Sequence, residues 1–166
     1  MMLMVRQGGV LPQFWRCELT ATFDYPVGIA PDDIDHMGHV NNAVYLRWVQ
    51  AAVIAHWEHV APAEAVARHL WIALKHEITY RRPAFLDDAL CATVTIDAIQ
   101  GARAMYRTLI RRGDEVMAEA SSIWCCLDAG SRRPIRLARD VARRFLPLAE
   151  PDVQDAPEPG DQGLAG

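Results

Sequence analysis

The 166-residue sequence is poor in lysine, in cysteine and in long apolar runs, and each shortage excludes a class of protein. Lys75 is the only lysine, so sixteen of the seventeen basic residues are arginines, which suit phosphates and carboxylates but also follow from a biased codon composition. The four cysteines lack Cys-x-x-Cys spacing, which favours reduced thiols and a cytoplasmic location over a disulfide framework. No apolar stretch reaches the roughly 20 residues of a membrane span, and the N-terminal MMLMVRQGG has too short an apolar run for a signal peptide.

The signatures of several enzyme classes are absent as well. The sequence has no G-x-S-x-G, no P-loop, no G-x-G-x-x-G and no H-E-x-x-H. Two histidine pairs with a three-residue spacing, His36/His39 and His56/His59, raise the alternative of a metal site. No cysteine stands at zinc spacing beside them, so we expect neither a metal nor another cofactor. The second pair is better explained as the polar ends of a core helix, and His76 as a hydrogen-bonded core histidine.

Acidic residues are concentrated at the C-terminal end. Residues 147–166 contain five acids, four prolines, three glycines and no base, a composition that cannot offset the entropy of ordering the chain. Removing these five negative charges from the total of −4 leaves +1 for residues 1–146, which argues against a nucleic-acid partner. We therefore predict a lead segment over residues 1–15, one folded domain over residues 16–146 and a disordered tail over residues 147–166.

Hydrophobic periodicity predicts one long helix among strands. Residues 42–59 are apolar on almost every side of a helix, which indicates burial on nearly every side. Alternating patterns predict strands over residues 19–25, 71–80, 89–99, 103–111 and 115–127, followed by a weak helix over 139–145. In the second strand, Ile72, Leu74, Ile78 and Tyr80 are expected on one face.

Only a strongly curved sheet can cover so apolar a helix on several sides. The sequence therefore predicts an α+β fold in which about five antiparallel strands wrap a long central helix. The exposed strand edges and the remaining apolar stripe of the helix favour a partner copy, as a dimer or a dimer of dimers.

The stretch from Asp35 to Asn42, with the pattern D-x-x-G-H-x-N-N, carries the chemistry that the sequence suggests. The helix begins near Asn41 or Asn42, and its first N–H groups have no partner within the helix, so they favour developing negative charge. A carboxylate one turn away can act as a base or a nucleophile, and Gly38 allows a close approach of the backbone to a carbonyl group. The simpler alternative is an N-cap asparagine beside a solvated Asp35.

The segment DIDHMGHVNNAVYLRW resembles the signature of hotdog-fold acyl-CoA thioesterases, in the 4-hydroxybenzoyl-CoA thioesterase-like branch. The segment ITYRRPAFLDDAL (Ile78–Leu90) is similar to the strand and turns that follow the central helix in that family, and RRPIRL (Arg132–Leu137) fits more loosely. The resemblance covers residues 19–146. It implies a hotdog fold, hydrolysis of an acyl-CoA thioester, an acyl chain lying along the central helix, and an active site that the second subunit of a dimer completes.

The resemblance also assigns residues to roles. It places the catalytic carboxylate at Asp35 and the backbone N–H that polarises the thioester carbonyl at Asn42. On the substrate-binding side it places Gly38 at the turn, His39 and Asn41 in the motif, and the following aromatic at Tyr45. From the sequence itself, Arg81 and Arg82 follow a strand end and could reach the CoA phosphates. A solvated arginine pair is the alternative.

The sequence departs from the family at two points. Many relatives carry a glutamate in the middle of the helix, where this sequence has Gln50 and Ala51, so Asp35 has to serve alone. Met37 replaces a polar residue, which removes a relay through that position. Three alternatives stay open: a thioesterase that acts on acyl-carrier-protein thioesters, a hotdog module that binds acyl thioesters without hydrolysis, and a dehydratase that uses His39.

Overall fold

The computed structural model describes residues 21–146, and all structural statements below refer to this range. In chain order the elements are β1 (Thr22–Val27), the 3-10 turn η1 (Pro31–Asp33), α1 (Asn42–Val60), α2 (Ala63–Arg68), β2 (His69–Tyr80), β3 (Leu90–Gln100), β4 (Arg103–Arg112), β5 (Glu115–Asp128) and α3 (Arg139–Ala142). The predicted lead segment and the predicted tail lie outside the described residues, so both remain predictions.

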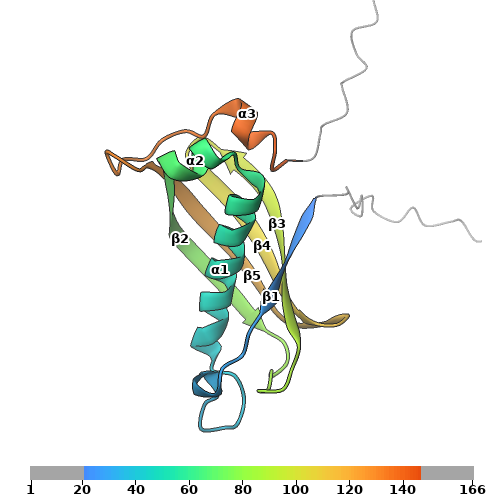
Figure 1. The fold of residues 1–166 in the computed structure, drawn as a ribbon. Coiled ribbons are helices and arrows are strands. Elements are labelled where there is room, and N and C mark those ends of the chain that lie inside the picture. The colour runs from blue at the N-terminus through green and yellow to red at the C-terminus, as the bar shows by residue number, and fades with distance from the viewer. Residues whose placement is uncertain (1–20, 147–166) are drawn as a thin grey trace, which may run out of the picture.

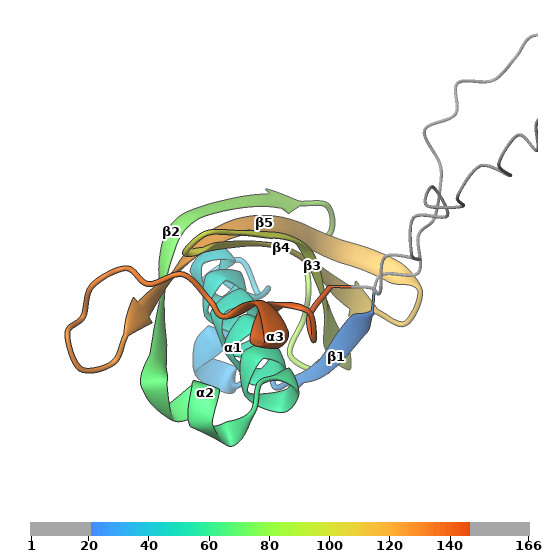
Figure 2. The ribbon, with the colours of Figure 1, turned by 90° about the horizontal axis from the view of Figure 1, so that it is seen from above.

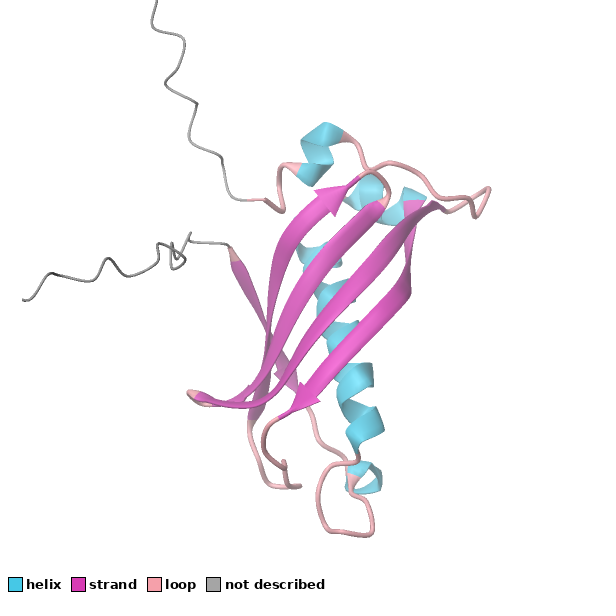
Figure 3. Cartoon of the chain, turned by 180° about the vertical axis from the view of Figure 1, so that it is seen from behind, coloured by secondary structure: helices cyan, strands magenta, loops and turns pink. Residues whose placement is uncertain are grey.

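The five strands form one antiparallel sheet in the order β1-β3-β4-β5-β2. Seen along α1, the sheet curves around the helix, with β2 at one edge and β1 at the other (Figure 2). Seen from behind, the convex face of the sheet lies in front and the helix lies on its far, concave side (Figure 3). This arrangement confirms the predicted α+β fold with a long helix wrapped by a curved sheet.

Helix α1 buries one side against the concave face of the sheet. Its buried residues are Tyr45, Trp48, Val49, Ala52, Val53, His56 and Trp57. On the other side Arg47 and Gln50 are exposed, and Leu46 and Ile54 are only partly buried. The prediction that nearly every side is buried is therefore wrong for a single chain, because the sheet encloses only one side of the helix.

Strand β2 contains a bulge that changes which residues face the helix. Its pairing with β5 shifts between Ala73 and Lys75, so Leu74 has no partner in the ladder. Leu70, Ile72 and Leu74 are consequently exposed on the outer face, with 36%, 46% and 49% of their surface accessible. The expectation that Ile72 and Leu74 share a face with Ile78 is wrong, because one extra residue reverses the alternation. Ile78 instead packs against the core.

Two inward-facing histidines are not satisfied by hydrogen bonds. Neither ring nitrogen of His76 has a partner among the described residues, and its ring lies edge-on to Trp124 at 5.6 Å. The expectation of a hydrogen-bonded His76 is therefore wrong. Nδ1 of His56 is also unpartnered within residues 21–146, and burial, aided by the nearby His59, lowers the pKa of His56 to about 4. Both observations indicate neutral imidazoles that act as packing groups.

The domain has two distinct ends (Figure 1). The loop that precedes α1 lies at one end, together with the segment that joins β2 to β3. The other end carries α2, α3 and the loop that follows β5. The described chain begins at β1 and finishes after α3, and both of these points lie away from the loop that precedes α1.

Candidate active site

The loop before α1 is held together by Asp33, a residue to which the sequence gave no role. The residue is buried at 3% exposure, and its carboxylate accepts a hydrogen bond from the Ala30 N–H at 2.9 Å. The same carboxylate forms an ion pair with Arg47 of α1, while the Asp33 carbonyl accepts the Asn41 N–H at 2.8 Å. The Ala30 N–H is the main cause that lowers the pKa of Asp33, so the carboxylate stays charged and ties the start of the loop to the helix.

Within this loop the chain folds back on itself around Asp35. The Asp35 N–H donates to the carbonyl of His39 at 2.9 Å, and the Gly38 N–H donates to the carbonyl of Asp35 at 3.0 Å. Gly38 has φ of +84°, which glycine adopts without the steric penalty of other residues. The predicted turn role of Gly38 thus has a local structural basis.

The fold brings Asp35 and His39 side by side. Oδ1 of Asp35 lies 3.7 Å from Nδ1 of His39 and accepts the Met37 N–H at 2.8 Å. The Asp35 side chain is 17% exposed and the His39 side chain 31%, so both are reachable from solvent. Oδ2 of Asp35 accepts no hydrogen bond from the described residues, which leaves one carboxylate oxygen free to meet a reacting group.

The N-terminus of α1 separates the roles of the two asparagines. The Asn41 side chain accepts the Ala43 N–H at 2.9 Å and is the N-cap. Asn42 is the first helical residue, and its N–H donates to no group within residues 21–146. Its carbonyl accepts the Tyr80 hydroxyl at 2.9 Å, which fixes the backbone there. The cap is therefore Asn41, and the role that the resemblance gives to the unpartnered N–H of Asn42 stays a prediction.

Tyr45 lies one turn further along the helix and inside the core. It is 2% exposed, its ring centroid is 5.0 Å from that of Trp48 and 5.3 Å from that of Tyr80, and burial raises its pKa. Within one chain its ring is a packing group, and its predicted contact with substrate stays a prediction.

Arg81 and Arg82 lie at the same end of the domain, directly after Tyr80. Each is already paired with a glutamate of β5: Arg81 with Glu119 at 2.7 Å and Arg82 with Glu115 at 2.7 Å. Both side chains are more than half exposed. A phosphate at this position would have to compete with these glutamates.

Two kinds of feature are absent from the described residues. Residues 21–146 contain no group of three or more histidine, cysteine, aspartate or glutamate side chains arranged to hold a metal ion. In the same range, no helix combines the length and the apolar character needed to cross a bilayer.

A curved antiparallel sheet around one long helix is the hotdog arrangement that the solved thioesterase neighbours share. The family model of the thioesterase-like superfamily matches residues 29–145. The chain therefore belongs to the thioesterase-like superfamily.

Individual relatives agree with this membership. The chain is 26% identical over 116 residues to the long-chain acyl-CoA thioesterase FadM of Escherichia coli (strain K12), covering 68% of this chain and 88% of that protein. It is 23% identical over 130 residues to the acyl-CoA thioesterase YbgC of Haemophilus influenzae, covering 74% of this chain and 93% of that protein. A solved thioesterase from Thermus thermophilus, complexed with coenzyme A and Zn, has the same fold with a TM-score of 0.64 and 24% identity, covering 74% of this chain and 90% of that chain.

Proposed function

We propose that the protein hydrolyses acyl-CoA thioesters to a free acid and CoA, and that Asp35 carries the reaction. The observation that carries this proposal is the free N–H of Asn42 at the start of α1, in the same loop-and-helix unit as the partly exposed Asp35 carboxylate. An unpartnered N–H at a helix N-terminus favours the oxyanion that forms when a thioester carbonyl is attacked. The names of the FadM and YbgC relatives support acyl-CoA as the substrate class and, with it, the cytoplasmic location that the sequence predicts.

Two reaction sequences use these groups. In the first, the Asp35 carboxylate attacks the carbonyl carbon, the C–S bond breaks, CoA leaves as a thiolate that takes a proton from water, and water then cleaves the resulting anhydride. In the second, Asp35 takes a proton from a water molecule as that water attacks, and the proton passes to the leaving sulfur when the tetrahedral intermediate collapses. A rapid-quench experiment separates them, because only the first yields an acylated Asp35 peptide by mass spectrometry.

A panel of acyl-CoA and acyl-carrier-protein thioesters tests the function. We expect CoA thiol release from at least one acyl-CoA, and the order of rates along the panel gives the acyl preference. Hydrolysis of carrier-protein thioesters alone would favour the second candidate substrate class. Tight binding without thiol release would favour a non-hydrolytic module, and formation of an enoyl product would favour a dehydratase.

Arg81 and Arg82 are proposed to contact the CoA phosphates. Replacing either by alanine should raise KM for acyl-CoA about 3- to 10-fold, the range of one charge-assisted hydrogen bond at an exposed site. KM for the corresponding acyl-pantetheine thioester, which lacks the nucleotide phosphates, should not change. An unchanged KM for acyl-CoA in both variants would leave the two arginines as partners of Glu115 and Glu119 only.

We also propose a homodimer or a dimer of dimers. Strand β2 is an edge of the sheet, and Leu70, Ile72 and Leu74 are exposed on it, while one side of α1 is open. Such surfaces favour association through closed symmetry. Light scattering at micromolar concentration should give a mass of at least two chains, and replacing Ile72 by glutamate should shift the equilibrium towards monomer. A monomeric parent protein would contradict this proposal.

A further inference from the structure

The segment between β2 and β3, residues 81–89, forms one wall of the loop that contains Asp35. The Val40 N–H donates to the carbonyl of Ala84 at 2.8 Å, and both residues are buried, at 3% and 0% exposure. The ring of Phe85 meets the imidazole of His39 edge-on, with centroids 6.1 Å apart. The position of this segment therefore sets the position of His39 and of the backbone that leads into α1.

Apolar packing holds this segment only weakly. Ala84 is buried, but Phe85 and Leu86 are 45% and 43% exposed. The segment contains no strand or helix, and its first residues are attached to the sheet by the Arg81 and Arg82 N–H groups, which both donate to the carbonyl of Met117. The second half of the segment is therefore held in place by polar interactions and not by burial.

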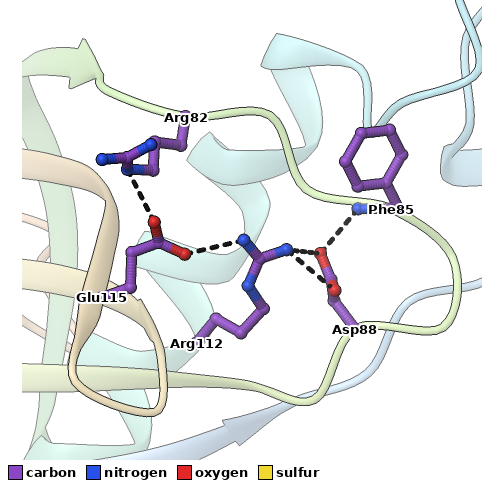
Figure 4. Close-up of polar contacts among 5 residues, drawn as sticks. All are labelled: Arg82, Phe85, Asp88, Arg112 and Glu115. Carbon is purple, nitrogen blue, oxygen red and sulfur yellow. Dashed lines mark hydrogen bonds and ion pairs between the residues drawn. The ribbon is translucent and has the colours of Figure 1, made fainter.

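An ionic network supplies that attachment (Figure 4). Oδ2 of Asp88 accepts the Phe85 N–H at 2.9 Å, and both Asp88 oxygens accept from one terminal nitrogen of Arg112, at 3.0 and 2.9 Å. The other terminal nitrogen of Arg112 donates to Glu115 at 2.7 Å, and the second oxygen of Glu115 lies 2.7 Å from Nε of Arg82. Arg82 and Asp88 stand near the two ends of the segment, so the network fastens both ends to the turn between β4 and β5.

The geometry suits arginine in particular. One guanidinium group contacts two carboxylates at once, which a lysine ammonium on a flexible stem does with less geometric specificity. Asp88 is the least exposed member, at 16% of its side chain, while Arg112 and Glu115 are about one-third exposed. With two acids and two bases, the network is electrically balanced.

We propose that Arg112 is a positioning residue for the reaction at Asp35: it holds Asp88, which fixes Phe85 and Ala84 against His39 and Val40. This inference rests on the proposed function for its kinetic consequence. Its structural content does not depend on the substrate.

The test compares Arg112→Gln with Arg107→Gln. Both arginines lie on β4. Arg107 forms an ion pair with Asp97, with nitrogen and oxygen 3.1 Å apart, and this pair does not involve residues 81–89. Arg107 is therefore a matched control. For Arg112→Gln we expect kcat for acyl-CoA to fall about 10- to 100-fold, the range for a misplaced reacting geometry. KM should stay within about threefold, because no substrate contact is removed. Arg107→Gln should match the parent, and Arg112→Lys should lie between.

A second readout does not depend on activity. Hydrogen exchange of the Val40 amide should become about fivefold faster in Arg112→Gln and in Asp88→Asn, because the Val40–Ala84 hydrogen bond opens more often. In the double variant, Arg112→Gln with Asp88→Asn, the Val40 amide should exchange no faster than in either single variant, since each substitution removes the same ion pair. A parent protein that hydrolyses no thioester would contradict the proposed function, and the exchange measurement would still decide this inference.

Three results would overturn the inference. The first is a kcat for Arg112→Gln within twofold of the parent. The second is an equal loss of kcat in Arg107→Gln, which would indicate general destabilisation. The third is a fall in kcat with unchanged exchange at Val40, which would mean that Arg112 acts by another route.

Discussion

Replacing Asp35 by asparagine is expected to reduce kcat for acyl-CoA hydrolysis by about 10²–10⁴-fold, the usual loss when a positioned base is removed. The amide has the shape of the carboxylate and can still accept the Met37 N–H, so the loop should keep its conformation. The charge that attacks the carbonyl or takes a proton from water is lost. If Asp35 is the nucleophile, the loss should be at least as large.

The control for this variant is Asp32→Asn, which removes an exposed carboxylate three residues earlier in the same loop region. It should retain the parent kcat. Binding of a non-hydrolysable thioether analogue, measured by calorimetry, should be similar in the parent and both variants, because neither substitution removes a proposed phosphate contact. If Asp35→Asn hydrolysed acyl-CoA at nearly the parent rate, Asp35 would not be the catalytic carboxylate, and His39 would be the next candidate.

The second large effect is expected from Asn42→Pro. Proline has no N–H, but it is well tolerated as the first residue of a helix. The preceding residue, Asn41, already has φ of −59° and ψ of 134°, which is the conformation that proline requires of its neighbour. The substitution therefore removes the proposed oxyanion donor with little change in the fold. We expect kcat to fall about 10²–10³-fold, as when one such donor is lost.

Asn42→Ala is the matched control, since it keeps the N–H and removes only the side chain. It should retain kcat and stability, because the cap belongs to Asn41. Asn41→Ala should instead lower the free energy of unfolding by about 1 kcal/mol. Circular dichroism melting curves check that all variants are folded. If Asn42→Pro hydrolysed acyl-CoA as fast as Asn42→Ala, the helix N–H would not stabilise the oxyanion.

Local patterns predicted most of the fold. The apolar run after Asn41 and the capping asparagines predicted a helix over 42–59, and α1 spans Asn42–Val60. The alternation predicted strands over 103–111 and 115–127, which agree with β4 and β5 to within a residue at each end. These features depend on neighbours in the sequence, so the order of residues alone contains enough information to predict them.

The features that the sequence did not predict depend on distant contacts. The bulge at Leu74 arises from pairing with β5, about fifty residues later in the chain. No residue near Leu74 indicates the change in pairing register. Asp33 received no role from the sequence, because its burial and its ion pair with Arg47 arise only when η1 meets the helix. Asp88 and Arg112 are 24 residues apart, one in the loop before β3 and the other at the end of β4, and the sequence around each is of ordinary composition. A carboxylate next to a strand start and an arginine at a strand end are the only hints of their pairing.

The position of the described chain ends has a practical consequence. The start of β1 and the end of α3 both lie away from the Asp35 loop (Figure 1). A fluorescent reporter, an affinity handle or a surface tether that is joined directly to either end of the described domain therefore starts at a distance from this loop. Enzyme immobilised through either end should have the same kcat. A mechanical or optical probe placed there should report on the domain without changing the reaction rate.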